Sequence, residues 1–269
     1  QGLFRASVAD QDALRQKGKA VMTLIAAATN PGLISGITDE RSYLGSEDTL
    51  LGLHWPPTEV LQNENLMQKI RNYRDRERPP KYVQLENLVR QKADDGKKIL
   101  IWSNYINNLR AIQKELKGFG TALVYGAVKD DDRANEIKRF REDSNCVALI
   151  TNPQTLGEGI SLHDVCHDAV YVDRTYNAAL YLQSIDRIHR LGLSHDQKTN
   201  VYFMQSEGSI DLSVANRLEE KIRVLASVMD DDSLVISSIP DVDQEAEYEE
   251  ILGSDVADMK SAALHILDS

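Results

Sequence analysis

The sequence of 269 residues lacks several features that would assign it to a class at once. No run of about 18 apolar residues occurs and the start shows no signal-peptide pattern, so neither a membrane protein nor a secreted one is indicated. Only two cysteines are present, Cys146 and Cys166, which favours a reducing compartment over a disulfide framework. The phosphate-binding pattern G-x-x-x-x-G-K-[ST] is absent, and no acidic box for Mg²⁺ follows a suitable strand. A phosphoryl-transfer site built from these residues would therefore lack half of its parts.

Negative charge is concentrated at one end of the chain. The formal net charge is −11, and residues 230–269 hold 12 of the 42 acidic residues but only one of the 31 basic residues. The rest of the chain has 30 residues of each sign and is neutral, so the acidic balance does not exclude a polyanionic partner. We expect residues 230–269 to form a loosely attached acidic tail.

Apolar runs alternate with amphipathic stretches from residue 96 to residue 229, after a mostly helical segment over residues 1–95. Strands are predicted at 99–103, 121–125, 146–151, 169–173 and 200–204. Helices are predicted at 13–29, 58–77, 82–92, 107–117, 131–142, 178–191 and 211–229. Continuous apolar strands separated by helices indicate a parallel sheet with helices on both faces. In such an α/β fold, ligands bind beyond the carboxyl ends of the strands.

The stretch from Gln183 to Gly192 reads Q-S-I-D-R-I-H-R-L-G and carries the strongest chemical signal. If it belongs to a helix from about Asn177 to Gly192, then Gln183, Arg187 and Arg190 lie on one face at i, i+4 and i+7. A guanidinium stays charged and offers a planar fork of donors that matches phosphate oxygens, so this row can bind a triphosphate. The alternative is an ordinary solvated helix face.

Polar or glycine-containing segments follow three of the predicted strands. Gly157 and Gly159, after the 146–151 strand, allow close approach of the backbone to a ligand, although a turn that needs two glycines is the commoner reason for such a pair. Ser103 and Asn104 end another strand, where they can meet a phosphate or simply cap the next helix. Gly126 repeats this arrangement one strand later.

A possible metal-binding pattern lies in the connection between two predicted strands. His163 and His167 are four residues apart and Cys166 stands beside His167. No second group of ligands occurs elsewhere in the sequence, so we predict no metal site here.

Taken in order, these motifs resemble the second RecA-like lobe of superfamily II helicases and translocases, in particular the Swi/Snf type of DNA-dependent ATPase. The segment 99–104 resembles motif IV of that family, and 151–162 resembles motif V. The segment 173–177, read D-R-T-Y-N, with 183–192 after it, resembles motif VI. Tyr176 replaces the usual Trp and Ala178 the usual Pro. The resemblance covers residues 80–228 and extends weakly into the preceding helices, which resemble the linker between the lobes.

The resemblance implies a role for each group of residues. Arg187 and Arg190 would be the arginine fingers. The nucleotide side of the cleft and its coupling to DNA would be served by Gly157, Glu158, Gly159, Gln183 and Asp186. The DNA backbone would be contacted by Ser103, Asn104, Gly126 and Thr151.

The resemblance also implies cofactors and partners. ATP and Mg²⁺ would be bound mainly by an N-terminal RecA-like lobe outside this sequence, so the fragment alone is expected to be inactive. The partners would be double-stranded DNA, that lobe and possible further proteins. Two alternatives stay open, a lobe of an RNA or single-strand helicase and a non-catalytic docking module. The glutamate at position 158 is more similar to bacterial members of the family, so a bacterial cytoplasmic protein is expected, and a nuclear protein is the alternative. The biological pathway stays open, and phage defence is one of the candidates.

Overall fold

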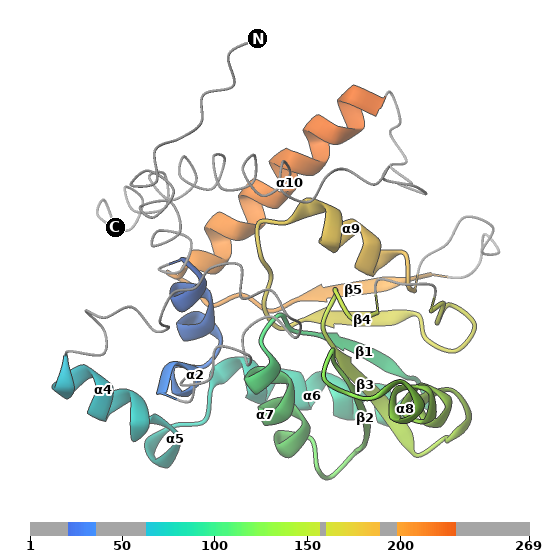
Figure 1. The fold of residues 1–269 in the computed structure, drawn as a ribbon, viewed down its shortest axis with the longest axis horizontal. Helices are drawn as coiled ribbons and strands as arrows, with labels where there is room; N and C mark the ends of the chain where they lie inside the picture. The colour runs from blue at the N-terminus through green and yellow to red at the C-terminus, as the bar shows by residue number, and fades with distance from the viewer. Residues whose placement is uncertain (1–20, 36–62, 157–159, 189–197, 230–269) are drawn as a thin grey trace.

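The protein is described here by a computed structural model that covers residues 21–35, 63–156, 160–188 and 198–229. Its centre is a five-stranded sheet in the order β2-β3-β1-β4-β5, and every neighbouring pair is parallel (Figure 1). The strands are β1 (Ile99–Trp102), β2 (Gly120–Val124), β3 (Cys146–Thr151), β4 (Asp168–Tyr171) and β5 (Asn200–Phe203). The predicted parallel α/β sheet is therefore confirmed, with strand bounds within two residues of those expected. Within the described residues, no helix is long and apolar enough to cross a membrane.

Helices cover both faces of the sheet because its strands are apolar on both sides. Along β1, Ile99 and Ile101 pack in one core with α6 (Pro80–Asp94) and α7 (Ile106–Glu115). The alternate residues Leu100 and Trp102 pack in a second core with α8 (Asp130–Glu142) and α9 (Ala178–Ile185). Side chains alternate between the two faces along a strand, so a run such as Ile99–Trp102 supplies both cores at once.

A third core joins the N-terminal helices to the carboxyl edge of the sheet. Residues 21–29 are helical, and Ile25 and Ala26 pack with Val214 and Leu218 of α10 (Ile210–Met229). The Tyr105 hydroxyl donates a hydrogen bond to the Met22 carbonyl at 2.8 Å. The short helix α2 (Gly32–Ser35) leads towards α4 (Glu64–Arg71) and α5 (Tyr73–Arg76). The helical residues 21–29 thus pack against the lobe.

The structure differs from the predicted organisation at two places. The helix expected over 58–77 is interrupted at Asn72, which leaves the helical conformation between α4 and α5. Helix α6 is part of the predicted segment 1–95, yet it packs directly on the sheet. The predicted acidic tail and residues 1–20 lie outside the described residues, so the division at 95/96 and 229/230 stays a prediction.

A buried ion pair fastens several of these elements together. The Lys81 ammonium on α6 lies 2.7 Å from an Asp211 carboxylate oxygen on α10, and both side chains are almost fully buried. The same ammonium donates to the Val172 carbonyl at 3.0 Å and to the Thr29 hydroxyl at 3.4 Å. The Asp211 carboxylate also accepts the Ser206 N–H at 2.8 Å. One lysine thereby joins α6, α10, the end of β4 and helix 21–29.

This pair predicts a strongly non-additive mutant cycle. Lys81→Met leaves the Asp211 carboxylate buried without its cation and should lower the free energy of unfolding by about 3–5 kcal/mol. Lys81→Met combined with Asp211→Asn removes both charges and should cost clearly less than the two single changes added together. Urea unfolding of the two single variants and the double variant measures this difference.

The exposed pair Arg223–Glu219 on α10 is the control, because both of its side chains are more than 70% exposed. Arg223→Met should change the free energy of unfolding by less than about 1 kcal/mol. Additive costs for Lys81 and Asp211 would show that the two groups are stabilised independently of each other.

Candidate functional site

Polar residues from four strands meet at the carboxyl edge of the sheet. Ser103 and Asn104 follow β1, Thr151 ends β3, and Asp173 lies two residues beyond β4. Gly126 follows β2, in the turn that leads to α8. Because all five strands are parallel, these residues gather at one edge, as the sequence predicted.

The centre of this edge is the carboxylate of Asp173, which is only 1% exposed. One of its oxygens accepts the backbone N–H of Asn104 at 2.8 Å and the side-chain amide of Asn104 at 2.9 Å. The other accepts the Ser103 hydroxyl and the Asn108 amide, the latter at 3.1 Å. Burial raises the pKa of Asp173, while these hydrogen bonds and the nearby Lys81 charge act in the opposite direction. The carboxylate is thus the shared acceptor for the segment after β1.

The network continues from Asn108 into the N-terminal segment. The Tyr82 hydroxyl on α6 donates to the Asn108 side-chain oxygen, and the Asn30 amide donates to the Tyr82 oxygen at 3.0 Å. Asn30 in turn accepts the Gly32 N–H at 2.9 Å. One chain of buried hydrogen bonds therefore joins the site edge to α6, α7 and the N-terminal helices.

The predicted DNA contacts differ in how accessible they are. Ser103 and Thr151 are fully buried, and the Ser103 hydroxyl donates to Asp173. The backbone and side-chain N–H donors of Asn104 also go to Asp173. Gly126 is exposed. The donors that the sequence predicts for a phosphate thus largely bond within the protein. Their acceptor is Asp173, which the sequence singles out only as the first residue of segment 173–177.

Arg187 joins the two segments that resemble motifs V and VI. Its Nε donates to the Gln183 carbonyl at 3.2 Å, and its Nη1 lies 3.5 Å from the Ile160 carbonyl. Its own carbonyl accepts the Leu162 N–H at 2.9 Å. The next residue, Ile188, is fully buried in the core of this face. The backbone at Arg187 is therefore fixed against segment 160–162.

The predicted helical row is wrong for Gln183 and Arg187, the two of its residues that the structure describes. Helix α9 begins as expected, since the Asn177 side chain accepts the Leu180 N–H at 3.0 Å as an N-cap. It ends at Ile185, however, and residues 186–188 form a turn, so Arg187 does not follow Gln183 on a helix face. Asp186 is the C-cap residue. Arg190 lies outside the described residues, as do Gly157, Glu158 and Gly159.

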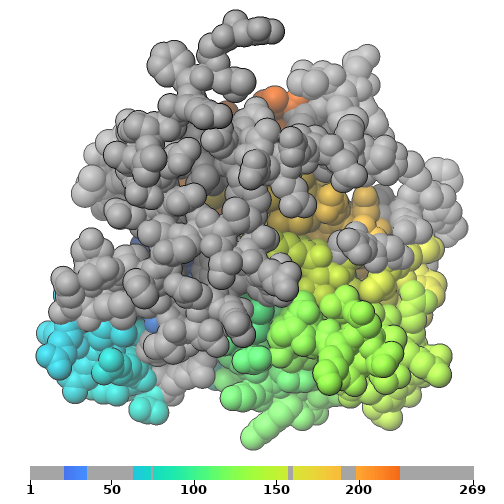
Figure 2. Space-filling view, viewed as in Figure 1, coloured from blue at the N-terminus to red at the C-terminus, as the bar shows by residue number. Residues whose placement is uncertain are grey.

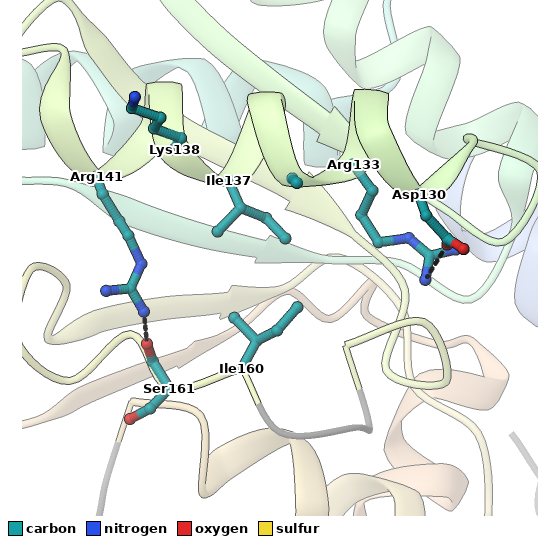
Figure 3. Close-up of a pocket in the computed structure, with 8 residues that line it drawn as sticks. Asp130, Arg133, Ile137, Lys138, Arg141, Ile160 and Ser161 are labelled. Carbon is teal, nitrogen blue, oxygen red and sulfur yellow. Dashed lines mark hydrogen bonds and ion pairs between the residues drawn. The ribbon is translucent and has the colours of Figure 1, made fainter.

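A cavity of about 580 Å³ lies between α8 and the segment that contacts Arg187. Figure 3 shows Ile137 of α8 facing Ile160 across it, and Figure 2 shows the yellow-green residues of α8 at the surface. Its three cations are each paired with a carboxylate: Arg133 with Asp130 at 3.5 Å, Lys138 with Glu142 at 3.9 Å, and Arg141 with Asp164 at 3.1 Å. The cavity therefore offers an anion little unbalanced charge.

The cysteine–histidine stretch is occupied by other contacts. The Cys166 thiol lies 3.2 Å from the Asp168 carbonyl and 3.5 Å from the Lys98 carbonyl, and burial raises its pKa to about 12. The His163 ring nitrogen Nδ1 contacts the Ser161 hydroxyl. Over the described part of the chain, no three His, Cys, Asp or Glu side chains are placed to hold a metal ion together.

Comparison with known proteins finds a matching domain and several similar proteins. Residues 80–192 match the helicase conserved C-terminal domain. The ATP-dependent DNA helicase DDM1 of Arabidopsis thaliana is 30% identical over 149 residues, which are 54% of this chain and 19% of that protein. Helicase SWR1 of Saccharomyces cerevisiae is 28% identical over 143 residues, 52% of this chain and 9% of that protein. The chain thus matches a fifth or less of each relative.

A solved structure supports the architecture. The C-terminal part of the Fun30 ATPase domain superposes with a TM-score of 0.51 at 17% identity, covering 87% of this chain and 81% of that one. At this identity the likeness concerns the fold alone. The RecA-like lobe and its resemblance to Swi/Snf-type ATPases, both predicted from the sequence, are confirmed.

The expected bacterial, cytoplasmic location is wrong. The relatives come from a plant and a yeast, which contradicts the bacterial assignment inferred from Glu158. The idea of phage defence, which depended on the bacterial assignment, has no support either.

The raised pKa of Asp173 predicts a pH-dependent difference in stability. The native state holds the Asp173 proton more tightly than the unfolded state, so this group stabilises the fold at low pH. That stabilisation is lost as the pH rises from about the ordinary Asp value of 3.8 through the native pKa. Asp173→Asn has no such loss. The difference in unfolding free energy, wild type minus variant, should therefore be largest at the most acid pH and shrink as the pH rises.

Urea unfolding of both proteins across acid and neutral pH measures this difference. Effects of all other carboxylates are shared by the two proteins and cancel in it. A difference that grows with pH would mean that hydrogen bonds, rather than burial, dominate the pKa of Asp173.

Proposed function

Because residues 80–192 match the helicase conserved C-terminal domain and the chain resembles Swi/Snf-type ATPases, we propose that this chain is the C-terminal motor lobe of an ATP-dependent double-stranded DNA translocase. The Arabidopsis relative is an ATP-dependent DNA helicase, which supports ATP and DNA as ligands of the protein to which this chain belongs. We propose a nuclear location on the same grounds.

The observation that carries this proposal is the position of Arg187. Its carbonyl and guanidinium bond segment 160–162 and the end of α9, which are the segments that resemble motifs V and VI. A guanidinium fixed in this way can neutralise the charge that develops as a γ-phosphoryl group leaves, and Arg190 is proposed as its partner. Gln183 and Asp186, at the end of the same helix, are proposed to organise the nucleotide side of the cleft.

The residues present fit a part of an ATP site and not the whole. The sequence has no P-loop, and the described residues place no group of carboxylates for Mg²⁺. We therefore assign the metal and most nucleotide contacts to an N-terminal lobe and propose that these 269 residues alone do not turn over ATP. This chain supplies the guanidinium groups, and Gly157, Glu158 and Gly159 are proposed to couple the nucleotide site to DNA.

The carboxyl edge is proposed as the surface that follows DNA. Gly126 is exposed and can offer main-chain groups to a phosphate, while Asn104 is held in place by Asp173. Ser103 and Thr151 are buried, so we propose that they support this edge rather than reach DNA through their side chains. Contacts of this kind position a duplex and carry no sequence information.

Arg187→Ala in the whole protein should separate catalysis from binding. If the guanidinium acts in the transition state, DNA-stimulated kcat should fall by about 10³-fold or more, while the Kd for nucleotide changes far less. Steady-state turnover and equilibrium nucleotide binding measure the two effects.

Arg90→Ala on α6 is the matched control, because Arg90 is exposed and pairs with Glu86 on its own helix. It should leave both kcat and Kd near the wild-type values. Equal losses of nucleotide affinity and of rate in Arg187→Ala would reassign Arg187 to ground-state binding and remove the arginine-finger proposal.

A further inference from the structure

An aromatic row crosses three strands at the last position before the carboxyl edge. Trp102 of β1 is in register with Tyr171 of β4, which is in register with Phe203 of β5. The ring centroids are 6.2 Å and 5.6 Å apart, and both pairs are stacked. Tyr181 of α9 packs on Tyr171 at 5.3 Å and on Phe203 at 6.2 Å. The row begins at fully buried Trp102 and ends at Phe203, which is 41% exposed on the edge strand.

Arg174 lies over the exposed end of this row. Its guanidinium carbon is 4.3 Å from the centroid of the Phe203 ring. The loop that carries it is fixed on both sides, by the hydrogen bonds to the Asp173 carboxylate before it and by the Asn177 N-cap of α9 after it. A guanidinium stacked on a rigid ring at the end of a rigid loop loses little further freedom when it binds an anion.

The charge of Arg174 has no hydrogen-bonded counter-ion in the part of the chain that the structure describes. Burial lowers the pKa of Arg174, while Tyr181, Asp211 and Tyr171 raise it from a distance. Asp211 is committed to Lys81 at 2.7 Å and to the Ser206 N–H at 2.8 Å. Arg90, which also lies over a ring, that of Phe119 at 5.3 Å, bonds a carboxylate of its own at 2.7 Å. Arg174 thus bears the cost of partial burial without that compensation.

We propose that Arg174 binds a phosphate group at the carboxyl edge of the sheet. The Phe203 ring covers one face of the guanidinium, and its planar fork of N–H donors matches the oxygens of a phosphate. This inference rests on the proposed function, which brings two phosphate-bearing ligands to the lobe, duplex DNA and ATP. Arg174 precedes α9 and Arg187 follows it, so the two guanidinium groups serve different positions.

The test compares Arg174→Ala and Arg174→Gln with wild type in the whole protein. Arg90→Ala is the control, since it removes another arginine that stacks on a ring. Binding of a fluorescein-labelled duplex is followed by anisotropy over a series of NaCl concentrations, and ATP binding is measured by calorimetry. Thermal unfolding shows whether each variant is folded. If Arg174→Ala does not fold, Arg174→Gln replaces it in the test, because glutamine keeps most of the side-chain length.

If Arg174 binds a DNA phosphate, both variants should weaken duplex binding about three- to tenfold at low salt. The slope of log Kd against log[NaCl] should then become smaller by about one, with the Kd for ATP unchanged. If it binds a nucleotide phosphate, the Kd for ATP should rise instead and the salt slope should stay the same. Either result supports a phosphate-binding Arg174 and identifies the source of the phosphate.

Variants that match Arg90→Ala in the salt slope and in the Kd for ATP would overturn the inference. In that case, wild-type DNA binding and the loss of turnover in Arg187→Ala would still uphold the proposed function. A wild-type protein that bound neither duplex nor ATP would contradict both.

Discussion

The buried carboxylate of Asp173 is the interaction on which the carboxyl edge of this lobe depends. It accepts hydrogen bonds from Ser103, from the backbone and side chain of Asn104, and from Asn108. An isolated charge at 1% exposure would be very costly, and these donors offset much of that cost. The same burial that raises its pKa makes each donor hard to replace, because a lost partner cannot be exchanged for water.

This arrangement links the edge to parts of the chain that are distant in sequence. Asn108 accepts a hydrogen bond from Tyr82 on α6, and Tyr82 accepts one from Asn30. The residue before Tyr82, Lys81, forms an ion pair with Asp211 on α10. The loop between β4 and α9 is thereby fixed relative to the N-terminal helices and to α10. For a lobe proposed to move as one body against another, these contacts keep the edge and the helices together. The Asp173 network also holds the loop that carries Arg174, which we propose binds a phosphate.

The sequence was sufficient for the fold because the signal for a parallel sheet is repeated in every strand. Runs such as Ile99–Trp102 are apolar at every position and so predict burial on both faces. The individual contacts were less predictable. Asn104 has donors that suit a phosphate, yet only the fold reveals that Asp173, which lies 69 residues later, takes them. Helix α9 ends earlier than the predicted residue 191. Residues 186–188 continue the amphipathic pattern of the helix in the sequence, yet in the structure they form a turn in which Ile188 is buried in the core. The stacking of Arg174 on a ring could not be inferred either, since Arg174 lies in the loop after β4 and Phe203 lies on β5.

Hydrogen–deuterium exchange in an Asp173→Ala variant tests the central claim most directly. If Asp173 joins the edge to the N-terminal helices, amides of residues 103–109, 172–181 and 21–30 should all exchange faster than in wild type, while β2 and α8 keep their protection. Asp130→Ala, which changes a carboxylate that is 95% exposed, should leave all of these segments at wild-type rates. Faster exchange confined to the residues next to Asp173, with 21–30 and 103–109 unaffected, would contradict the account.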